Sequence, residues 1–167
     1  MLFCFSHVSW KEINKLVEKE PPAQSFSSLR FSNCAIPDSS EKTYNYYSFY
    51  RLNKITLSKK DTLYKWKEAI VQLDSLKKGL SVTFFQGDQL ADQYFLKGKW
   101  KDNFFYAKRR IKAKGVPPLY FFYNEKLSVI GRHGSEVSLL QSEMKMGMIV
   151  LFSAGGQEFS QEHYSVR

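Results

Sequence analysis

Apolar positions near the start of the chain recur at helical spacing. Ser9 and Glu12 form a capping box, in which the Ser9 hydroxyl accepts a hydrogen bond from the Glu12 amide and Glu12 reaches back. The apolar face that follows consists of Trp10, Ile13, Leu16 and Val17. Pro21 and Pro22 end this predicted helix, and the short apolar segment 2–5 before it is predicted as a strand.

The clearest helical pattern lies at 59–78. Ser58 is a good N-cap for this segment, and Gly79 is a typical residue just beyond a helix end. Its apolar positions, three or four residues apart, are Leu63, Trp66, Ile70, Leu73 and Leu76. The sequence therefore predicts a long amphipathic helix that packs on a sheet.

Other segments in the first hundred residues alternate with the period of a strand. We expect strands at 28–32 and 43–52, the second of them rich in tyrosine. Residues 80–86 alternate clearly and end at a Gly-Asp turn. Residues 88–96 are predicted as a short helix.

Two patterns fit residues 102–114. A helix would bury Phe104, Ala107 and Ile111 on one stripe, whereas a strand would alternate from Phe105 onwards. We favour the helix, which the glycine after it would end.

The last third of the chain is predicted as a hairpin, a helix and a strand. The hairpin pairs 119–123 with 127–131 across a polar turn. Residues 135–144 then have the pattern of a short capped helix, and 148–152 that of a buried strand. Residues 157–167 are predicted as a polar C-terminal tail.

These elements together predict a single α+β domain over residues 1–156. Its sheet would be mixed or antiparallel, with about five or six strands, and the 59–78 helix would pack on it. A length of 167 residues suits one domain with its own core.

Residues 107–143 resemble part of a known protein family. The segment from Ile111 through Gly115-Val116-Pro117, followed by the hairpin and the closing helix, is similar to the second half of a thioredoxin-type domain. The resemblance covers 107–143 and implies a thioredoxin-like C-terminal half as an alternative fold. The family's redox-active CxxC would follow 80–86, where the chain has no cysteine, so the resemblance implies no redox activity.

The positive charge is concentrated in one stretch. The chain has a formal net charge of +9, and residues 97–115 hold eight cations against Asp102 alone. The cations are Lys97, Lys99, Lys101, Lys108, Arg109, Arg110, Lys112 and Lys114. A charge that served only solubility would not need to be local.

This stretch predicts a non-enzymatic module that binds nucleic acid, DNA or RNA, through its phosphates. Lysine and arginine neutralise phosphates, and aromatic side chains between them can stack on unpaired bases. Trp100 is the aromatic residue expected to be exposed, and Arg109 and Arg110 suit bidentate phosphate contacts. An acidic protein or an anionic lipid surface is an alternative partner for the same basic face.

A small metal-independent nuclease or toxin is the enzymatic alternative. Arg132 and His133 lie between two glycines, in a segment that could expose a cation and an imidazole together. They could act as phosphate clamp and general acid or base, with basic residues from 108–112. An ordinary loop with Ser135 as the cap of the next helix is the structural explanation of the same residues.

The sequence shows no motif for a metal, a nucleotide or another cofactor. The histidines are widely spaced, and there is no CxxC, HExxH, P-loop or GxSxG motif. Cys4 and Cys34 are too few for a disulfide framework, although one disulfide between them is an alternative to two buried thiols. The apolar segment 1–5 is too short for a signal peptide or a membrane span, which favours a soluble cytoplasmic protein. The oligomeric state cannot be predicted from these patterns.

Overall fold

The computed structural model describes residues 10–34, 49, 69–116, 119–149 and 152–166. Within these ranges the protein consists of one short helix and one antiparallel sheet of nine strands. The elements are α1 (Trp10–Val17), β1 (Ser28–Ser32), β2 (Ile70–Leu76), β3 (Gly79–Gln86), β4 (Gln89–Lys101), β5 (Phe104–Ala107), β6 (Arg110–Val116), β7 (Tyr120–His133), β8 (Glu136–Ile149) and β9 (Phe152–Ser165).

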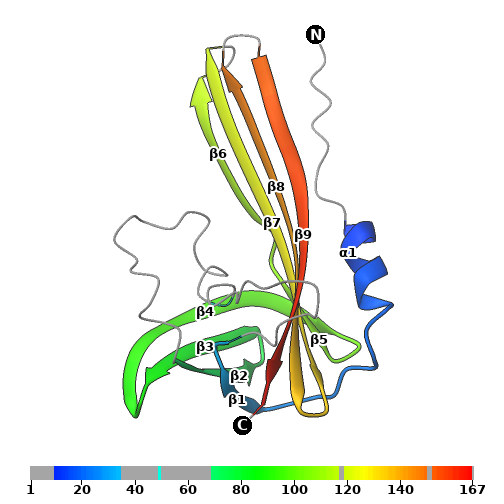
Figure 1. Ribbon diagram of the computed structural model, residues 1–167, viewed down its shortest axis with the longest axis vertical. Helices are drawn as coiled ribbons and strands as arrows, with labels where there is room; N and C mark the ends of the chain where they lie inside the picture. Colours follow the sequence, from blue (N-terminus) through cyan, green and yellow to red (C-terminus); the bar gives the residue numbers. More distant parts are fainter. Residues whose placement is uncertain (1–9, 35–48, 50–68, 117–118, 150–151, 167) are drawn as a thin grey trace.

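The strands follow the order β1-β2-β3-β4-β5-β7-β8-β9, and β6 also pairs with β7. Strands β5 and β6 pair with successive parts of β7, because Phe105 faces Ile130 whereas Arg110 faces Lys126. Figure 1 shows the result: a curled lower part, the base, and a long arm in which β6 to β9 run side by side.

The base encloses the larger of two hydrophobic cores. Its sheet curls until β1 meets the chain end beyond β9 at an antiparallel bridge between Phe31 and Val166. Phe31 and Tyr164 pack against each other inside, with ring centroids 5.4 Å apart. Other interior side chains are Leu73, Val82, Phe84, Phe105, Ile130 and Leu139. Large aromatic side chains therefore fill the curled sheet.

The second core lies on the opposite face of β7 and β8, under α1. Ile13 of α1 is fully buried there, and Trp10 lies 5.7 Å from Tyr106 between ring centroids. The sheet contributes Leu127, Val129, Leu140 and Met144. Because successive residues of a strand point to opposite faces, β7 contributes to both cores at once.

Aromatic rings cover glycines where the sheet curls. A Cβ atom at Gly98 would collide with the Phe105 ring and the Tyr106 carbonyl oxygen, and one at Gly131 would collide with the Phe104 ring. The glycines lack a side chain, so the rings lie directly on the backbone. Such pairs stabilise curved sheets at positions where a larger residue would not fit.

The prediction of an α+β fold is wrong, because the described chain is mostly β-sheet with one short helix. Two local predictions are confirmed: α1 forms where the capping box placed a helix, and β1 occupies 28–32. The strand predicted at 80–86 is also confirmed as part of β3.

The predicted helices at 59–78 and 88–96 are not found where the structure describes them. Residues Ile70–Leu76 form β2, which pairs with both β1 and β3, and residues 59–68 lie outside the described ranges. Residues 89–96 belong to the long strand β4. The predicted strands 2–5 and 43–52 also lie outside the described ranges, except for Phe49.

In the described part of the C-terminal half, every named element is a strand. The segment 102–114, favoured as a helix, forms β5 and β6, so the alternative prediction of a strand agrees better with the structure. The predicted hairpin turn near 124–126 lies within the continuous strand β7, and the predicted helix 135–144 is part of β8. Residues 157–165, expected in a polar tail, continue β9. The absence of a helix after Gly115 in the described residues removes the thioredoxin-like alternative.

Candidate functional site

The eight predicted cations do not share one surface. Register aligns Lys99 with Tyr106 of β5, and Tyr106 with Val129 of β7. Register also aligns Lys112 with Asn124 of β7. Because odd- and even-numbered residues of β7 point to opposite faces, the lysines of β4 and those of β6 lie on opposite faces of the sheet.

The β4 lysines form a row on the outward face of the base. Lys97, Lys99 and Lys101 are exposed, while Gly98 and Trp100 between them face the interior. Same-face neighbours on a strand are about 6.6 Å apart. Lys108 joins the row because its backbone N–H donates to the Lys97 carbonyl oxygen over 2.7 Å.

Two further lysines, not predicted as site residues, lie beside this row. Lys77 and Lys78 form the exposed turn between β2 and β3, and Gly79 directly after them pairs with Lys97. A two-residue turn between alternating segments was the signal that could have placed them. We define the lysine patch by its six members, Lys77, Lys78, Lys97, Lys99, Lys101 and Lys108.

The lysine patch carries little acidic compensation. Among the described residues its one ion pair joins Lys101 to Asp102 over 4.0 Å, and both side chains are well exposed. Such exposed pairs contribute little free energy. Within the described ranges, the patch therefore presents an excess of positive charge to solvent.

Arg109 forms an ion pair within the fold. Its Nε lies 3.0 Å from Oε1 of Glu125, whose side chain is 0% exposed. The Tyr123 hydroxyl donates to the other carboxylate oxygen of Glu125 over 2.7 Å. Burial, and then the hydrogen bond to Glu125, raise the pKa of Tyr123 to about 12. Arg109 thus balances a buried carboxylate.

Arg110, Lys112 and Lys114 lie on the face of β6 opposite to the lysine patch. Arg110 is half-buried, and burial lowers the pKa of its guanidinium, while the nearby Tyr94 acts in the opposite direction. Burial also raises the pKa of Tyr94, whose hydroxyl donates to the Phe49 carbonyl oxygen. Of these three cations, Lys114 is exposed.

The aromatic residues of the predicted basic segment are mostly internal. Trp100 packs edge-on against Phe26, with ring centroids 5.3 Å apart, and is only partly exposed. Phe104 and Phe105 are buried. Phe95, outside the predicted set, is 44% exposed and borders a shallow pocket of about 220 Å³ with Lys97 and Lys108.

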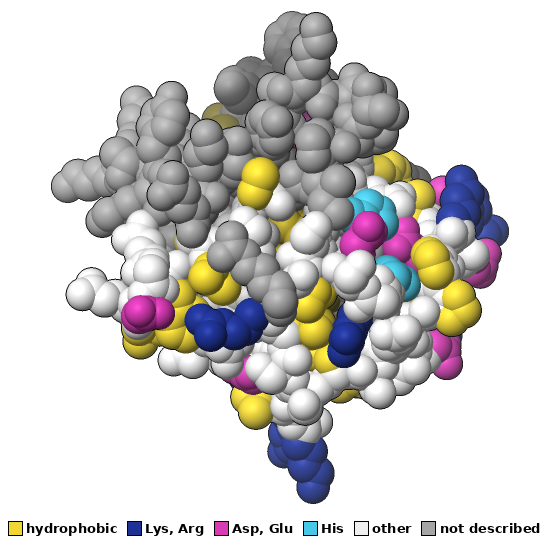
Figure 2. All heavy atoms as spheres, turned by 60° about the horizontal axis from the view of Figure 1, so that its bottom comes forward, with side chains coloured by type: hydrophobic (Ala, Val, Ile, Leu, Met, Phe, Trp, Pro, Cys, Tyr) yellow, Lys and Arg dark blue, Asp and Glu magenta, His cyan; other side chains and the backbone are white. Residues whose placement is uncertain are grey.

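Figure 2 shows the underside of the molecule. In Figure 2 the lysine and arginine side chains form separate groups between uncharged and apolar ones. Histidine lies beside acidic side chains on the same face, which marks a second polar cluster.

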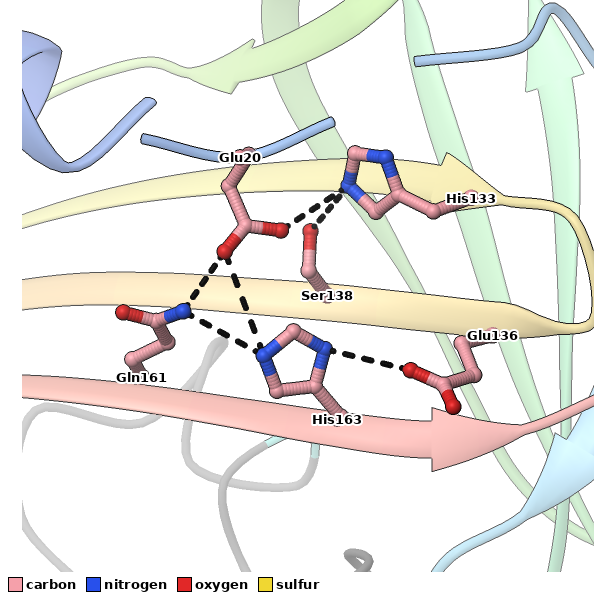
Figure 3. A network of polar contacts seen from close by, with 6 residues as sticks. All are labelled: Glu20, His133, Glu136, Ser138, Gln161 and His163. Carbon is pink, nitrogen blue, oxygen red and sulfur yellow. Dashed lines mark hydrogen bonds and ion pairs between the residues drawn. The ribbon is translucent and has the colours of Figure 1, made fainter. Parts of the chain in front are cut away.

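That cluster is centred on Glu20 (Figure 3), whose side chain is 2% exposed. Its Oε2 lies 3.0 Å from Nε2 of His133, and its Oε1 accepts a hydrogen bond of 2.6 Å from Gln161. His163 is more distant, with Nε2 3.9 Å from Glu20 Oε1 and Nδ1 3.6 Å from Glu136. The cluster ties the chain after α1 to β7, β8 and β9.

The geometry at His133 does not suit the enzymatic alternative. Ser138 and Glu20 both contact Nε2 of His133, at 2.9 and 3.0 Å, so this ring nitrogen already has two partners within the fold. Ser138 is fully buried. Nδ1 of His133 is also buried and has no hydrogen-bond partner among the described residues.

Arg132 and His133 do not converge on one substrate position. As neighbours on β7 they point to opposite faces, and the Arg132 Nε donates to the Gly134 carbonyl oxygen over 3.2 Å. The basic residues near 110 pair with β7 at Lys126, seven residues away, or about 23 Å along a strand. The structure therefore does not assemble the predicted nuclease site.

The described residues contain no group of three or more His, Cys, Asp and Glu side chains arranged to hold a metal ion. Within the same ranges, no helix has the length and apolar composition needed to cross a membrane.

Comparison with known proteins finds no matching family model, curated protein or solved structure. The function must therefore be inferred from the surface itself.

Proposed function

We propose that this protein is a non-enzymatic binding module that recognises an acidic protein partner through the lysine patch. The observation that carries the proposal is the row of Lys97, Lys99 and Lys101 on one face of β4, extended by Lys108 and by the β2–β3 turn. A rigid sheet holds these charges at regular spacing, so little order has to be created on binding.

The kind of cation favours an acidic protein surface over nucleic acid. Every member of the patch is a lysine, a point charge without the planar fork that arginine offers to phosphates. Arg109 is engaged by Glu125, and Trp100 packs against the core with only part of its surface exposed, so neither adds phosphate clamping or base stacking. Carboxylates on a protein surface need only complementary charge.

The test compares two anionic probes by fluorescence anisotropy: labelled polyglutamate and a labelled single-stranded oligonucleotide of equal charge. The variant Lys97→Glu/Lys99→Glu removes the centre of the patch. We expect wild type to bind polyglutamate with an affinity that falls as salt rises, and the variant to bind about tenfold more weakly or worse.

The matched control is Lys19→Glu/Lys114→Glu, which makes the same change in net charge at exposed lysines away from the patch. Thermal unfolding of both variants verifies that they fold. Equal losses of binding in the two variants would show that only net charge matters and would overturn the proposal. Tighter binding of the oligonucleotide than of polyglutamate would favour nucleic acid, the partner predicted from the sequence, and would also overturn it.

A further inference from the structure

The end of the arm farthest from the base contains cations but no acidic residue. We define this distal end as the last five paired positions of β6 to β9, which are residues 112–116, 120–124, 145–149 and 152–156. Its charged residues are Lys112, Lys114 and Lys145, and Lys145 lies 3.5 Å from the carboxylates of both Glu143 and Glu158. The first acidic residues along these strands, Glu125, Glu143 and Glu158, come only closer to the base.

Large apolar side chains are exposed at the same end. Val116 is 56% exposed and pairs with Tyr120, which is 48% exposed. Leu119, between them in sequence, is 62% exposed, and its backbone N–H donates to the Val116 carbonyl oxygen over 2.9 Å. Phe122 follows on the same face as Tyr120 and is also exposed. Exposed apolar residues gathered in one place indicate an interaction site.

The apolar and basic residues are separated along the axis of the arm. Lys114 pairs with Phe122, two positions behind the Val116–Tyr120 pair, or about 7 Å along the strands. Lys112 and Lys145 both align with Asn124, about 13 Å behind that pair. The arm therefore ends in Val116 and Tyr120, and the lysines follow behind this pair, with Lys114 level with Phe122.

We propose that the distal end of the arm inserts into the interface of a membrane that contains anionic lipid. Val116, Leu119 and Tyr120 enter the boundary between headgroups and acyl chains, and Lys114 lies among the lipid phosphates. Apolar and aromatic groups at the acyl boundary with lysines at headgroup level are the order that a lipid interface requires.

A membrane fits this surface better than an apolar groove of a protein partner. An apolar groove would exclude charge along its whole length, whereas Lys114 and Lys112 follow about 7 and 13 Å behind the Val116–Tyr120 pair on the same face of the sheet. Figure 1 shows the arm extending away from the base, so its end can meet a flat surface without interference from the base. The net charge of +9 attracts the chain to an anionic surface. The proposal does not depend on the lysine patch, which lies on the base.

The test uses flotation with two kinds of vesicle, phosphatidylcholine alone and phosphatidylcholine with phosphatidylserine. We expect wild type to float with the mixed vesicles and the variant Leu119→Asp to lose most of this binding. The control Leu90→Asp changes a residue that is equally exposed, at 61%, but lies at the start of β4. Because both leucines are on the surface, neither variant should unfold the protein.

The lysine patch is also attracted to anionic vesicles, so the flotation is repeated in the Lys97→Glu/Lys99→Glu background. Binding that persists there and is lost on adding Leu119→Asp supports insertion by the arm. A Tyr120→Trp variant should show a blue shift of its added emission on binding the mixed vesicles. Equal binding of Leu119→Asp and Leu90→Asp would overturn the proposal. Self-association that Leu119→Asp abolishes, without vesicle binding by wild type, would also overturn it and would indicate a second copy of the chain as the partner.

Discussion

The Glu20 carboxylate lies 3.0 Å from Nε2 of His133, and this contact joins the segment after α1 to the end of β7. The same segment is held by hydrogen bonds from Gln24 N–H to the Arg132 carbonyl oxygen, 2.8 Å, and from the Asn103 side chain to the Ala23 carbonyl oxygen, 3.0 Å. The buried carboxylate is therefore one of several ties that keep α1 on the sheet.

We expect Glu20→Ala to lower the free energy of unfolding by about 1–3 kcal/mol, because the largely buried His133 loses its partner. Hydrogen exchange should show that amides of residues 10–24 become less protected before the sheet does. Glu18→Ala is the control, since Glu18 is exposed nearby. Indistinguishable unfolding of the two variants would contradict a tethering role for Glu20.

Replacing Arg109 should lower stability, whereas replacing its neighbour Lys108 should weaken binding. Arg109→Ala leaves the buried Glu125 without its ion pair, so we expect a loss of about 1–3 kcal/mol in the free energy of unfolding. Lys108→Ala should leave stability within about 0.5 kcal/mol of wild type and weaken binding to polyglutamate. Chemical denaturation and anisotropy measure the two effects. A stable Arg109→Ala protein would show that the Glu125 pair is dispensable.

Aromatic coverage of glycine makes Gly98 intolerant of even a methyl group. We expect Gly98→Ala to destabilise the fold by about 1–3 kcal/mol, because the new Cβ meets the Phe105 ring and the Tyr106 backbone. Gly156→Ala is a matched control on β9, where a Cβ would meet no atom within 4 Å. Thermal unfolding compares them. Similar melting temperatures for the two variants would rule out close packing at Gly98.

Tyr123 should make stability depend on alkaline pH. Its pKa of about 12 in the folded protein exceeds its ordinary value of 10.0, so the folded state holds the phenolic proton more tightly. The resulting stabilisation is complete below pH 10 and is lost as the pH rises from about 10 to about 12. A shift of about two units corresponds to at most about 3 kcal/mol.

The measurement is the difference in stability between wild type and Tyr123→Phe across that pH range. Because the chain has 10 tyrosines, the difference in tyrosinate absorbance between the same two proteins isolates the ionisation of Tyr123. Glu125→Gln should bring the pKa of Tyr123 closer to its ordinary value, because it removes the adjacent negative charge. A Tyr123 that ionises near pH 10 in the folded protein would contradict this account.

Local signals in the sequence were sufficient where an element depends mainly on its own residues. The capping box at Ser9 and the prolines after Glu20 predicted α1, and the alternation at 80–86 predicted most of β3. The helix predicted at 59–78 is wrong over β2, because the apolar position Leu73 can be buried on a strand as well as on a helix. Pairing with β1 and β3, which buries Val71 and Leu73 together, selects the strand.

Polar residues inside β7 misled the prediction in the same way. The Asn124-Glu125-Lys126 segment has the composition of a turn, yet all three residues are buried in the strand. The Asn124 side chain donates to Glu143 over 2.9 Å, and Glu125 pairs with Arg109. These partners come from other parts of the chain, so nothing within the segment could reveal that its polar groups would be satisfied.

The sequence by itself determined the net charge, the cluster of cations after residue 97, the first helix and several strands, because these follow from composition and short-range pattern. Only the tertiary structure decided which cations share a surface. In the fold, Lys77 and Lys78 lie beside Lys97, the β6 cations lie on the other face of the sheet, and Arg109 pairs with Glu125. The physical reason is that strand pairing and register, set by residues far apart in the chain, determine the face to which each side chain points.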